Sequence, residues 1–291
     1  MAGFGPPPGH GKAAGTDFVL VHGAWHSGAA WAEVSFELTA AGARVCALDL
    51  PGAGPNARFP VSYLTTGQQG LTTEASPLRN LTLEDTADAV VAALRQLRGA
   101  GRKLVLVAHS LGGLTVTRAV EQAPDLVDHV VYVAALVPTL LGSAAAYLRL
   151  PEAGPRYPDL YLGDPAAIGA TRINFRSSDA GYRALLHRTF YGDVGEERFL
   201  AFANGLVPDN PTRIAAAEVG ATRERWGSIP RSYVLTTQDR VVTPALQRRM
   251  IADADRIAPA HRFRIGSLES SHSPFASKPR ELARLIRTLA A

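Results

Sequence analysis

Residues 104–113 read Leu-Val-Leu-Val-Ala-His-Ser-Leu-Gly-Gly, an apolar run that stops at a serine between small residues. The run predicts a buried strand, and the residues after Ser110 predict a tight turn into a helix. Such a turn accepts only small residues two positions before and after the serine, here Ala108 and Gly112. It exposes the hydroxyl at a helix N-terminus, where free backbone N–H groups stabilise negative charge. The segment therefore predicts a nucleophilic serine, with Ala108 in place of the more usual glycine.

Apolar runs alternate with helical patterns along most of the chain, which is typical of a mostly parallel sheet covered by helices on both faces. The predicted strands are 18–21, 44–48, 103–108, 129–135, 231–237 and 262–265. The predicted helices are 29–41, 82–98, 111–122, 244–257 and 278–290. Thr82 followed by Asp85 is close to a capping box and marks the start of the second helix. The pattern predicts an α/β fold.

Two stretches depart from this alternation. Residues 54–80 form a long segment rich in Pro, Gly and Thr, and loops of that length are usually functional or mobile. Residues 138–228 carry short helical pieces and many aromatic side chains, so we expect a helical cap inserted after the fourth predicted strand, over the carboxyl ends of the strands. The core is then expected in 16–137 and 229–291, and residues 1–15 are expected to be a disordered leader.

The composition and charge of the chain limit which binding partners are expected. The 30 Lys and Arg, all but three of them Arg, give a net charge of +4 without a basic stripe, so nucleic acid is not an expected partner. Cys46, expected to be buried in a strand, is the only cysteine, which excludes a disulfide framework and a thiolate metal cluster. No His and carboxylate spacing indicates a metal, and no cofactor is implied. Without a signal peptide or a membrane-length apolar run, we expect a cytoplasmic protein with no membrane partner; the oligomeric state is left open.

A serine nucleophile needs a base, normally histidine, which a carboxylate orients. Asp239 follows the predicted strand 231–237, and His272 follows the last predicted strand. Both should emerge at the sheet edge that carries Ser110, and the chain order Ser, Asp, His suits this architecture. Glu269 or Asp209 could replace Asp239 in a rearranged site.

The other histidines are weaker candidates for the base. His22 and His109 flank backbone positions that the turns of the site use, which favours structural or wall roles. His129 begins a predicted strand and His187 lies in the predicted cap. Three more have no strand-end placement that points at Ser110: His10, His26 and His261.

Acyl transfer also needs donors for the developing oxyanion, usually the N–H after the nucleophile and one from the loop after an early strand. Leu111 supplies the first, and the Ala24 N–H is the first choice for the second. Gly23 allows the close approach that a substrate oxygen requires. Trp25 is expected to shape a wall of the site rather than to carry chemistry.

Several segments together resemble the α/β-hydrolase superfamily, in the branch that contains plant methylesterases, hydroxynitrile lyases and bacterial esterase-like relatives. They are Val19 to Trp25, Leu48 to Gly52, Ala108 to Gly113, Tyr132 to Ala135, Thr237 to Asp239, and Ser271-His272. The resemblance implies an α/β-hydrolase fold, Ser110 as nucleophile, His272 as base, Asp239 as its partner, and the amides of Ala24 and Leu111 as oxyanion donors.

We therefore expect a serine carboxylic-ester hydrolase for a small or medium apolar ester. The lyases of this branch carry a threonine and a lysine where this chain has Gly23 and Ser273, which favours the esterase. The alternatives are a carbon–carbon lyase, a thioesterase or acyltransferase on a natural-product intermediate, and a ligand receptor that keeps the triad.

Overall fold

The centre of the molecule is a six-stranded sheet in the order β2-β1-β3-β4-β7-β8. The computed structural model describes residues 15–98, 101–155 and 157–291. Every neighbouring pair in this sheet is parallel, as the alternating pattern predicted. The strands are β1 (Thr16–Val21), β2 (Arg44–Leu48), β3 (Lys103–His109), β4 (His129–Val133), β7 (Arg231–Thr236) and β8 (Arg264–Leu268).

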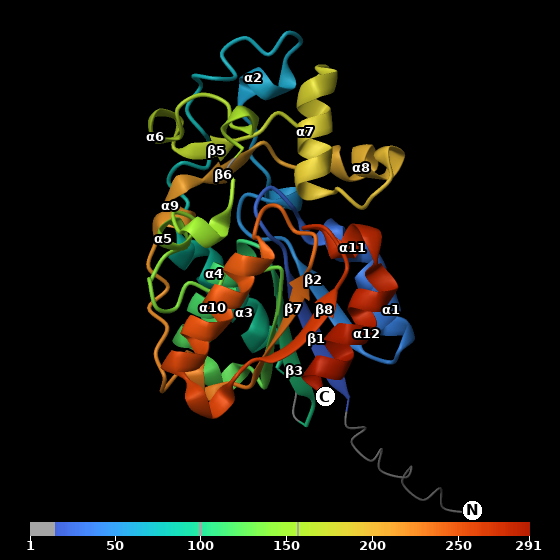
Figure 1. Ribbon diagram of the computed structural model, residues 1–291, viewed down its shortest axis with the longest axis vertical. Helices are drawn as coiled ribbons and strands as arrows, with labels where there is room; N and C mark the ends of the chain where they lie inside the picture. Colours follow the sequence, from blue (N-terminus) through green and yellow to red (C-terminus); the bar gives the residue numbers. More distant parts are fainter. Residues whose placement is uncertain (1–14, 99–100, 156) are drawn as a thin grey trace, which may run out of the picture.

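Helices cover both faces of the sheet because successive strand residues point to opposite sides (Figure 1). In β1, Phe18 and Leu20 pack in one apolar cluster with the helices α1 and α12, whereas Val19 and Val21 pack in another with α3, α4 and α10. These helices are α1 (Ala32–Ala40), α3 (Leu83–Leu97), α4 (Gly112–Gln122), α10 (Pro244–Ile257) and α12 (Pro279–Ala290). All five correspond to predicted helices.

The predicted start of α3 is confirmed. The Thr82 hydroxyl accepts from the Asp85 N–H, and the Asp85 carboxylate accepts from the Thr82 N–H, which completes a capping box. The first predicted helix instead opens with a 3₁₀ turn at Gly28–Trp31 before α1. The short helix α11 (Pro274–Ser277) precedes α12.

The insertion lies over the carboxyl ends of the sheet strands, at the top of Figure 1. Its helices are α5 (Ala144–Tyr147), α6 (Pro165–Ile168), α7 (Ala180–Phe190), α8 (Glu196–Ala203) and α9 (Thr212–Ala216). The insertion also contains a short antiparallel pair that the sequence analysis did not predict, β5 (Ala170–Arg172) and β6 (Asp209–Pro211). Three-residue strands are too short for alternation to reveal them.

The segment 54–80 is fastened to the insertion. It contains α2 (Val61–Leu64), whose first N–H groups donate to the Glu74 carboxylate. Arg172 of β5 donates to the carbonyls of Leu71 and Glu74, at 2.7 and 2.8 Å. This long loop and the insertion therefore form one layer above the sheet.

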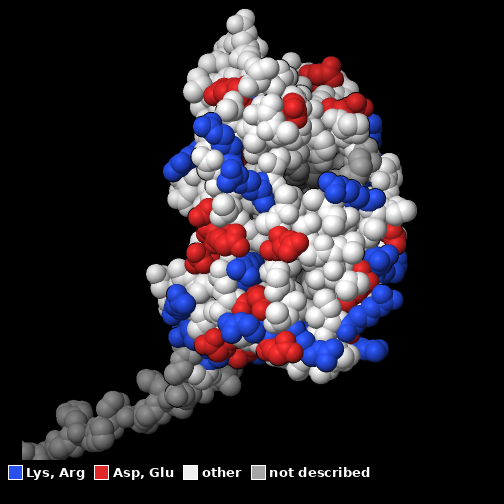
Figure 2. Space-filling model, turned by 90° about the vertical axis from the view of Figure 1, so that its left-hand side faces the viewer, with Lys and Arg blue, Asp and Glu red and all other residues white. Residues whose placement is uncertain are grey.

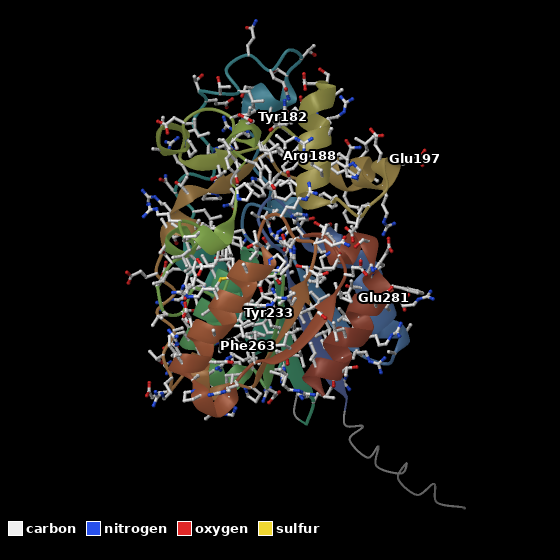
Figure 3. All side chains as sticks on the ribbon, in the orientation of Figure 1. Tyr182, Arg188, Glu197, Tyr233, Phe263 and Glu281 are labelled. Carbon is white, nitrogen blue, oxygen red and sulfur yellow. The ribbon has the colours of Figure 1, made fainter. Side chains whose placement is uncertain are left out.

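Several predicted strand boundaries move by one to three residues, and two of these shifts have a clear structural cause. The fourth strand ends at Val133, two residues early, because Ala134 adopts φ +46°, which turns the chain out of the sheet. The last strand runs from Arg264 rather than from residue 262, because the Phe263 N–H donates to Asp255 and its ring packs against Tyr233 (Figure 3).

Four further expectations concern the N-terminal leader, Cys46, the surface charge and membrane-spanning helices. Residues 1–14 of the predicted leader lie outside the described residues. Cys46 does lie in β2, but it is only half-buried. On the face shown in Figure 2, basic and acidic residues are interspersed and neither covers it. Within the described ranges, no helix is both long and apolar enough to cross a membrane.

Candidate active site

Ser110 lies at the turn between β3 and α4 in a left-handed backbone conformation, with φ +52°. For residues other than glycine, this conformation costs about 1–2 kcal/mol. The turn persists because Gly113 N–H and Leu136 N–H both donate to the Ser110 carbonyl at 3.0 Å. A Cβ on Gly112 would lie 2.4 Å from the His22 carbonyl oxygen, so the chain needs glycine there. The predicted turn geometry around Ser110 is thus present.

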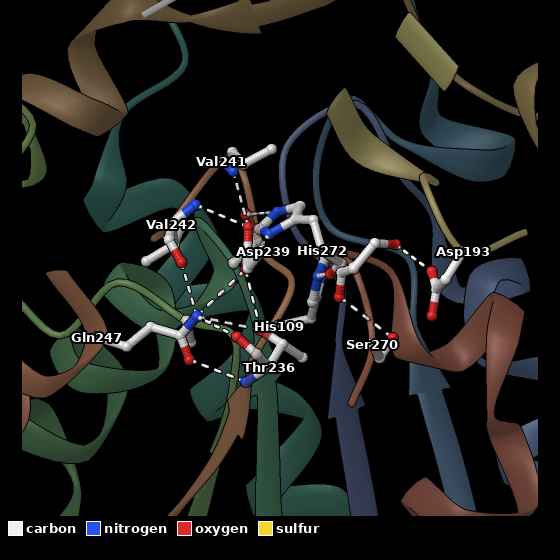
Figure 4. Close-up of polar contacts among 12 residues, drawn as sticks. His109, Asp193, Thr236, Asp239, Val241, Val242, Gln247, Ser270 and His272 are labelled. Atoms are coloured by element: carbon white, nitrogen blue, oxygen red, sulfur yellow. Dashed lines mark hydrogen bonds and ion pairs between the residues drawn. The ribbon is translucent and has the colours of Figure 1, made fainter. Parts of the chain in front are cut away.

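The structure brings Ser110, His272 and Asp239 together from three different loops. The His272 Nε2 lies 2.9 Å from the Ser110 Oγ. Its Nδ1 lies 2.9 Å from the Asp239 Oδ2 (Figure 4). Because a carboxylate only accepts, Nδ1 carries the proton and the Nε2 lone pair faces the serine hydroxyl. All three side chains are buried, which limits competition from water.

Asp239 is surrounded by donors that hold its carboxylate in one orientation. The N–H groups of Val241 and Val242 donate to Oδ1 at 2.8 and 3.0 Å, and the Thr236 hydroxyl donates to Oδ2 at 3.0 Å. The buried Gln247 amide donates to the Thr236 hydroxyl at 3.1 Å and reaches Asp239 Oδ2 at 3.4 Å. Sequence analysis missed Thr236 and Gln247, although the position of Thr236 at the end of the strand was a usable signal.

The two alternative carboxylates bond elsewhere. Glu269 accepts from Gln238 at the surface, at 3.2 Å. Asp209 forms a two-pronged ion pair with Arg172, at 2.6 and 2.8 Å, and both side chains are fully buried. Of the three candidates, Asp239 is the one that contacts His272.

The loop after β1 passes beside Ser110. A Cβ on Gly23 would lie 2.7 Å from the Ser110 Cβ, so only glycine fits at this approach. In the part of the chain that the structure describes, neither the Ala24 nor the Leu111 N–H donates to a protein acceptor. Two free backbone donors next to a serine can stabilise a negative oxygen.

Three further histidines line this region, and each donates a ring N–H to a backbone carbonyl. His22 Nδ1 donates to Gly23 at 2.8 Å, His26 Nδ1 to Ala24 at 2.7 Å, and His109 Nε2 to His272 at 2.8 Å. Burial lowers the pKa of His22, lowers that of His26 to about 3, and lowers that of His109 well below its ordinary value. These rings are therefore neutral hydrogen-bonding groups, and His26 lies nearer the site than its sequence position indicated.

The other histidines that the structure describes lie apart from the serine. His129 bonds the Ser232 hydroxyl in the sheet, and His187 bonds the Val194 carbonyl in the insertion. His261 lies in a 3₁₀ turn after α10, and His10 lies outside the described residues.

Aromatic side chains of the insertion lie against His272 and Trp25. The Phe190 ring lies 6.2 Å from the His272 ring and 5.7 Å from Trp25, and Trp25 also contacts Phe175. The Trp25 indole N–H donates to the Thr171 carbonyl of β5, which joins the loop after β1 to the insertion. Trp25 therefore lies between the loop after β1 and the insertion, and its role as a wall of the site remains a prediction.

A cavity of about 50 Å³ lies beside this loop and is lined mostly by apolar side chains. Its lining includes Ala24 and Leu111, together with Leu50, Leu78 and Ile214. Among the described residues, no three His, Cys, Asp or Glu side chains are grouped so that they could hold a metal ion.

Known proteins resemble this chain along most of its length. The sequence pattern of the family described as "Alpha/beta hydrolase family" matches residues 18–285. Methyl jasmonate esterase 1 of Vitis vinifera is 28% identical over 281 residues, which cover 94% of this chain and 95% of that protein. Esterase PIR7B of Oryza sativa is 30% identical over 291 residues, covering 94% and 95%. Among solved structures, a pyrethroid hydrolase from Sphingobium faniae is 25% identical, with a TM-score of 0.71 over 94% of this chain and 97% of that one.

Proposed function

The chain belongs to the alpha/beta hydrolase family, and we propose that this carboxylic-ester hydrolase works through an acyl-enzyme on Ser110. The observation that carries the proposal is the unbroken contact from the Ser110 Oγ through the His272 ring to Asp239. The roles of the three residues, which the sequence motifs predicted, are part of this proposal.

The reaction begins when the Ser110 Oγ attacks the ester carbonyl and its proton passes to His272 Nε2. The carbonyl oxygen becomes an oxyanion that accepts from the N–H groups of Ala24 and Leu111. The C–O bond to the alcohol then breaks, and His272 gives its proton to the leaving oxygen. A water molecule attacks the acyl-enzyme by the same proton route and releases the acid. Asp239 stabilises the transient imidazolium throughout.

A small or medium apolar ester is the proposed substrate. Phe175 and Phe190 pack against Trp25 beside the site. Ligand pockets are generally lined by apolar side chains of this kind, which favours an apolar substrate. Two of the similar proteins are named for what they hydrolyse, methyl jasmonate and a pyrethroid. No cofactor, nucleic acid or membrane enters the proposal, and a cytoplasmic location remains a prediction.

Cyanohydrin cleavage is disfavoured by two positions. The resemblance implies that lyases of this branch use a threonine side chain and a lysine, where this chain has Gly23 and Ser273. Gly23 offers no side chain, and Ser273 is buried without a charge. We expect no cyanide release from mandelonitrile above the buffer rate; rapid, Ser110-dependent release would replace the esterase assignment with a lyase.

The deciding experiment is labelling with a fluorophosphonate, followed by peptide mapping and turnover of p-nitrophenyl esters. We expect one adduct, on Ser110, and steady turnover by the unmodified protein. Ser110→Ala should fold normally and lose about four to six orders of magnitude in kcat, on the scale of such triads. An adduct on another serine would contradict the proposal, and labelling of Ser110 without turnover of any ester would favour a receptor.

A further inference from the structure

The residue before His272 forms a hydrogen bond to the insertion. The Ser271 hydroxyl donates to Oδ1 of Asp193, which lies between α7 and α8, 78 positions away in the sequence (Figure 4). One residue further along, the His272 carbonyl accepts from His109 Nε2 at 2.8 Å. The backbone around His272 is therefore held by one bond from the core and by one bond from the insertion.

The surroundings of Asp193 keep its carboxylate ready to accept from this loop. Burial acts to raise its pKa, but contacts with three serine hydroxyls lower it below its ordinary value. These hydroxyls belong to Ser271, Ser277 and Ser270, and the last two lie 2.9 Å from each other. Because an ionised carboxylate only accepts, the bond with Ser271 has one direction, and Ser271 itself is only 3% exposed.

The position of the His272 ring depends on the backbone that carries it. Its bond to Asp239 fixes one ring nitrogen, but the other must also lie 2.9 Å from the Ser110 Oγ. A displacement of about 1 Å between reacting groups costs up to about 10²-fold in rate. Since Ser271 and His272 share a peptide bond, a contact that holds the Ser271 side chain also restricts where the ring can lie.

We infer that Asp193 is a positioning residue for His272, which places the ring against Ser110 by holding the Ser271 hydroxyl. This inference rests on the proposed function, since it assigns a role within the same reaction. Asp193 acts through Ser271 and not by contact with the reacting atoms. The insertion then contributes to the chemical step, in addition to covering the carboxyl ends of the strands.

A second contact between the insertion and the core provides a matched control. Arg198 of α8 donates to the Ala276 carbonyl of α11 at 2.7 Å. Like Asp193, it fastens the insertion to the segment that follows β8, but its partner lies four residues beyond His272. Arg198→Met therefore weakens this attachment and leaves the bond to Ser271 in place.

The measurements are kcat and KM for a p-nitrophenyl ester, the rate at which a fluorophosphonate labels Ser110, and thermal unfolding. Asp193→Ala and Ser271→Ala should each lose about 10- to 100-fold in kcat with little change in KM, and labelling should slow by a similar factor. The double variant should be no slower than Asp193→Ala, because both substitutions remove the same bond. Asp193→Asn keeps an acceptor oxygen and should stay within about threefold of the parent, since a neutral acceptor gives a weaker bond. Arg198→Met should keep its kcat.

Four results would overturn the inference: losses that multiply in the double variant, an Asp193→Ala variant with the parent's kcat, an Asn variant as slow as the Ala variant, or an equal loss in Arg198→Met. If thermal unfolding shows that Asp193→Ala does not fold, Ser271→Ala decides alone, and the parent's kcat in that variant would refute the role. If Ser110→Ala retained activity, the proposed function itself would fail, a result that does not depend on Asp193.

Discussion

Asp239 orients the His272 ring by accepting a hydrogen bond from its Nδ1. The carboxylate accepts from His272 Nδ1 and from three further donors in its own loop and strand, so its oxygen positions are defined before substrate binds. This arrangement gives His272 a single useful tautomer, with the free lone pair toward Ser110. The same tautomer lets the neutral His272 ring accept the serine proton at Nε2.

Asp239→Asn should keep the fold and lose about 10⁴-fold in kcat, since an amide can no longer impose the tautomer. Glu269→Gln is the control: Glu269 lies at the surface and bonds Gln238, so this variant should match the parent. Steady-state kinetics with a p-nitrophenyl ester measures both. An Asn variant nearly as active as the parent would move the carboxylate role to another residue.

Position 23 has no room for a side chain beside Ser110. Gly23→Ala places a methyl carbon about 2.7 Å from the Ser110 Cβ, inside van der Waals contact, so the loop or the serine must move. We expect kcat to fall by at least about 10²-fold, the cost of a displaced oxyanion donor.

Gly195→Ala is the matched control for this prediction, because a Cβ at Gly195 has nothing within 4 Å and its φ is −62°. Kinetics and thermal unfolding of both variants separate loss of activity from loss of stability. Full activity in Gly23→Ala would contradict the close approach of this loop.

At the scale of elements, Arg172 joins the insertion to the long loop before α3 and also forms a buried ion pair within the insertion. Arg172 of β5 pairs with Asp209 of β6 and also donates to two carbonyls of the segment 54–80. A buried pair adds little over apolar packing, but removing one partner leaves an uncompensated charge. The pair therefore specifies how three segments meet rather than supplying most of their stability.

Arg172→Met should lower the free energy of unfolding by about 3–5 kcal/mol, because Asp209 is left buried and unpaired. Arg172→Met combined with Asp209→Leu should recover most of that loss, since neither charge remains. Urea denaturation of the parent, the single and the double variants tests this. A double variant as unstable as the single one would show that the carbonyl contacts of Arg172 matter more than the ion pair.

At the scale of the whole molecule, stability depends on histidines that fold in their neutral form. Burial lowers the pKa of His22, His26, His109 and His129, the second to about 3 and the fourth to about 4. In the unfolded chain these groups titrate near 6.5. Below that pH the unfolded state binds more protons than the folded state, so stability falls as the pH falls.

The free energy of unfolding should therefore decrease between pH 7 and pH 5, by up to about 1.4 kcal/mol per pH unit for each such histidine once the pH lies well below 6.5. Urea denaturation at several pH values measures this slope. The His129→Asn variant should lose the part of the slope that corresponds to about one bound proton. A free energy that is constant over this range would contradict the burial of neutral histidines.

Much of this protein could be predicted from local pattern. Apolar runs and helical periodicity predicted all six sheet strands and five main helices, because each pattern depends on residues close in sequence. The small residues around Ser110 predicted the turn, and strand ends predicted where Asp239 and His272 emerge, since parallel strands share one carboxyl edge.

The tertiary structure alone decided the contacts between distant segments. The bond of Gln247 beside Asp239, the bond of His22 to Leu50, and the pairing of Arg172 with Asp209 each join side chains whose neighbours depend on register and packing. The turn at Ala134 likewise follows from how β4 meets the serine loop, and not from its own alanine. Periodicity says which face of an element is apolar, but only the folded chain determines which polar atoms meet within hydrogen-bonding distance.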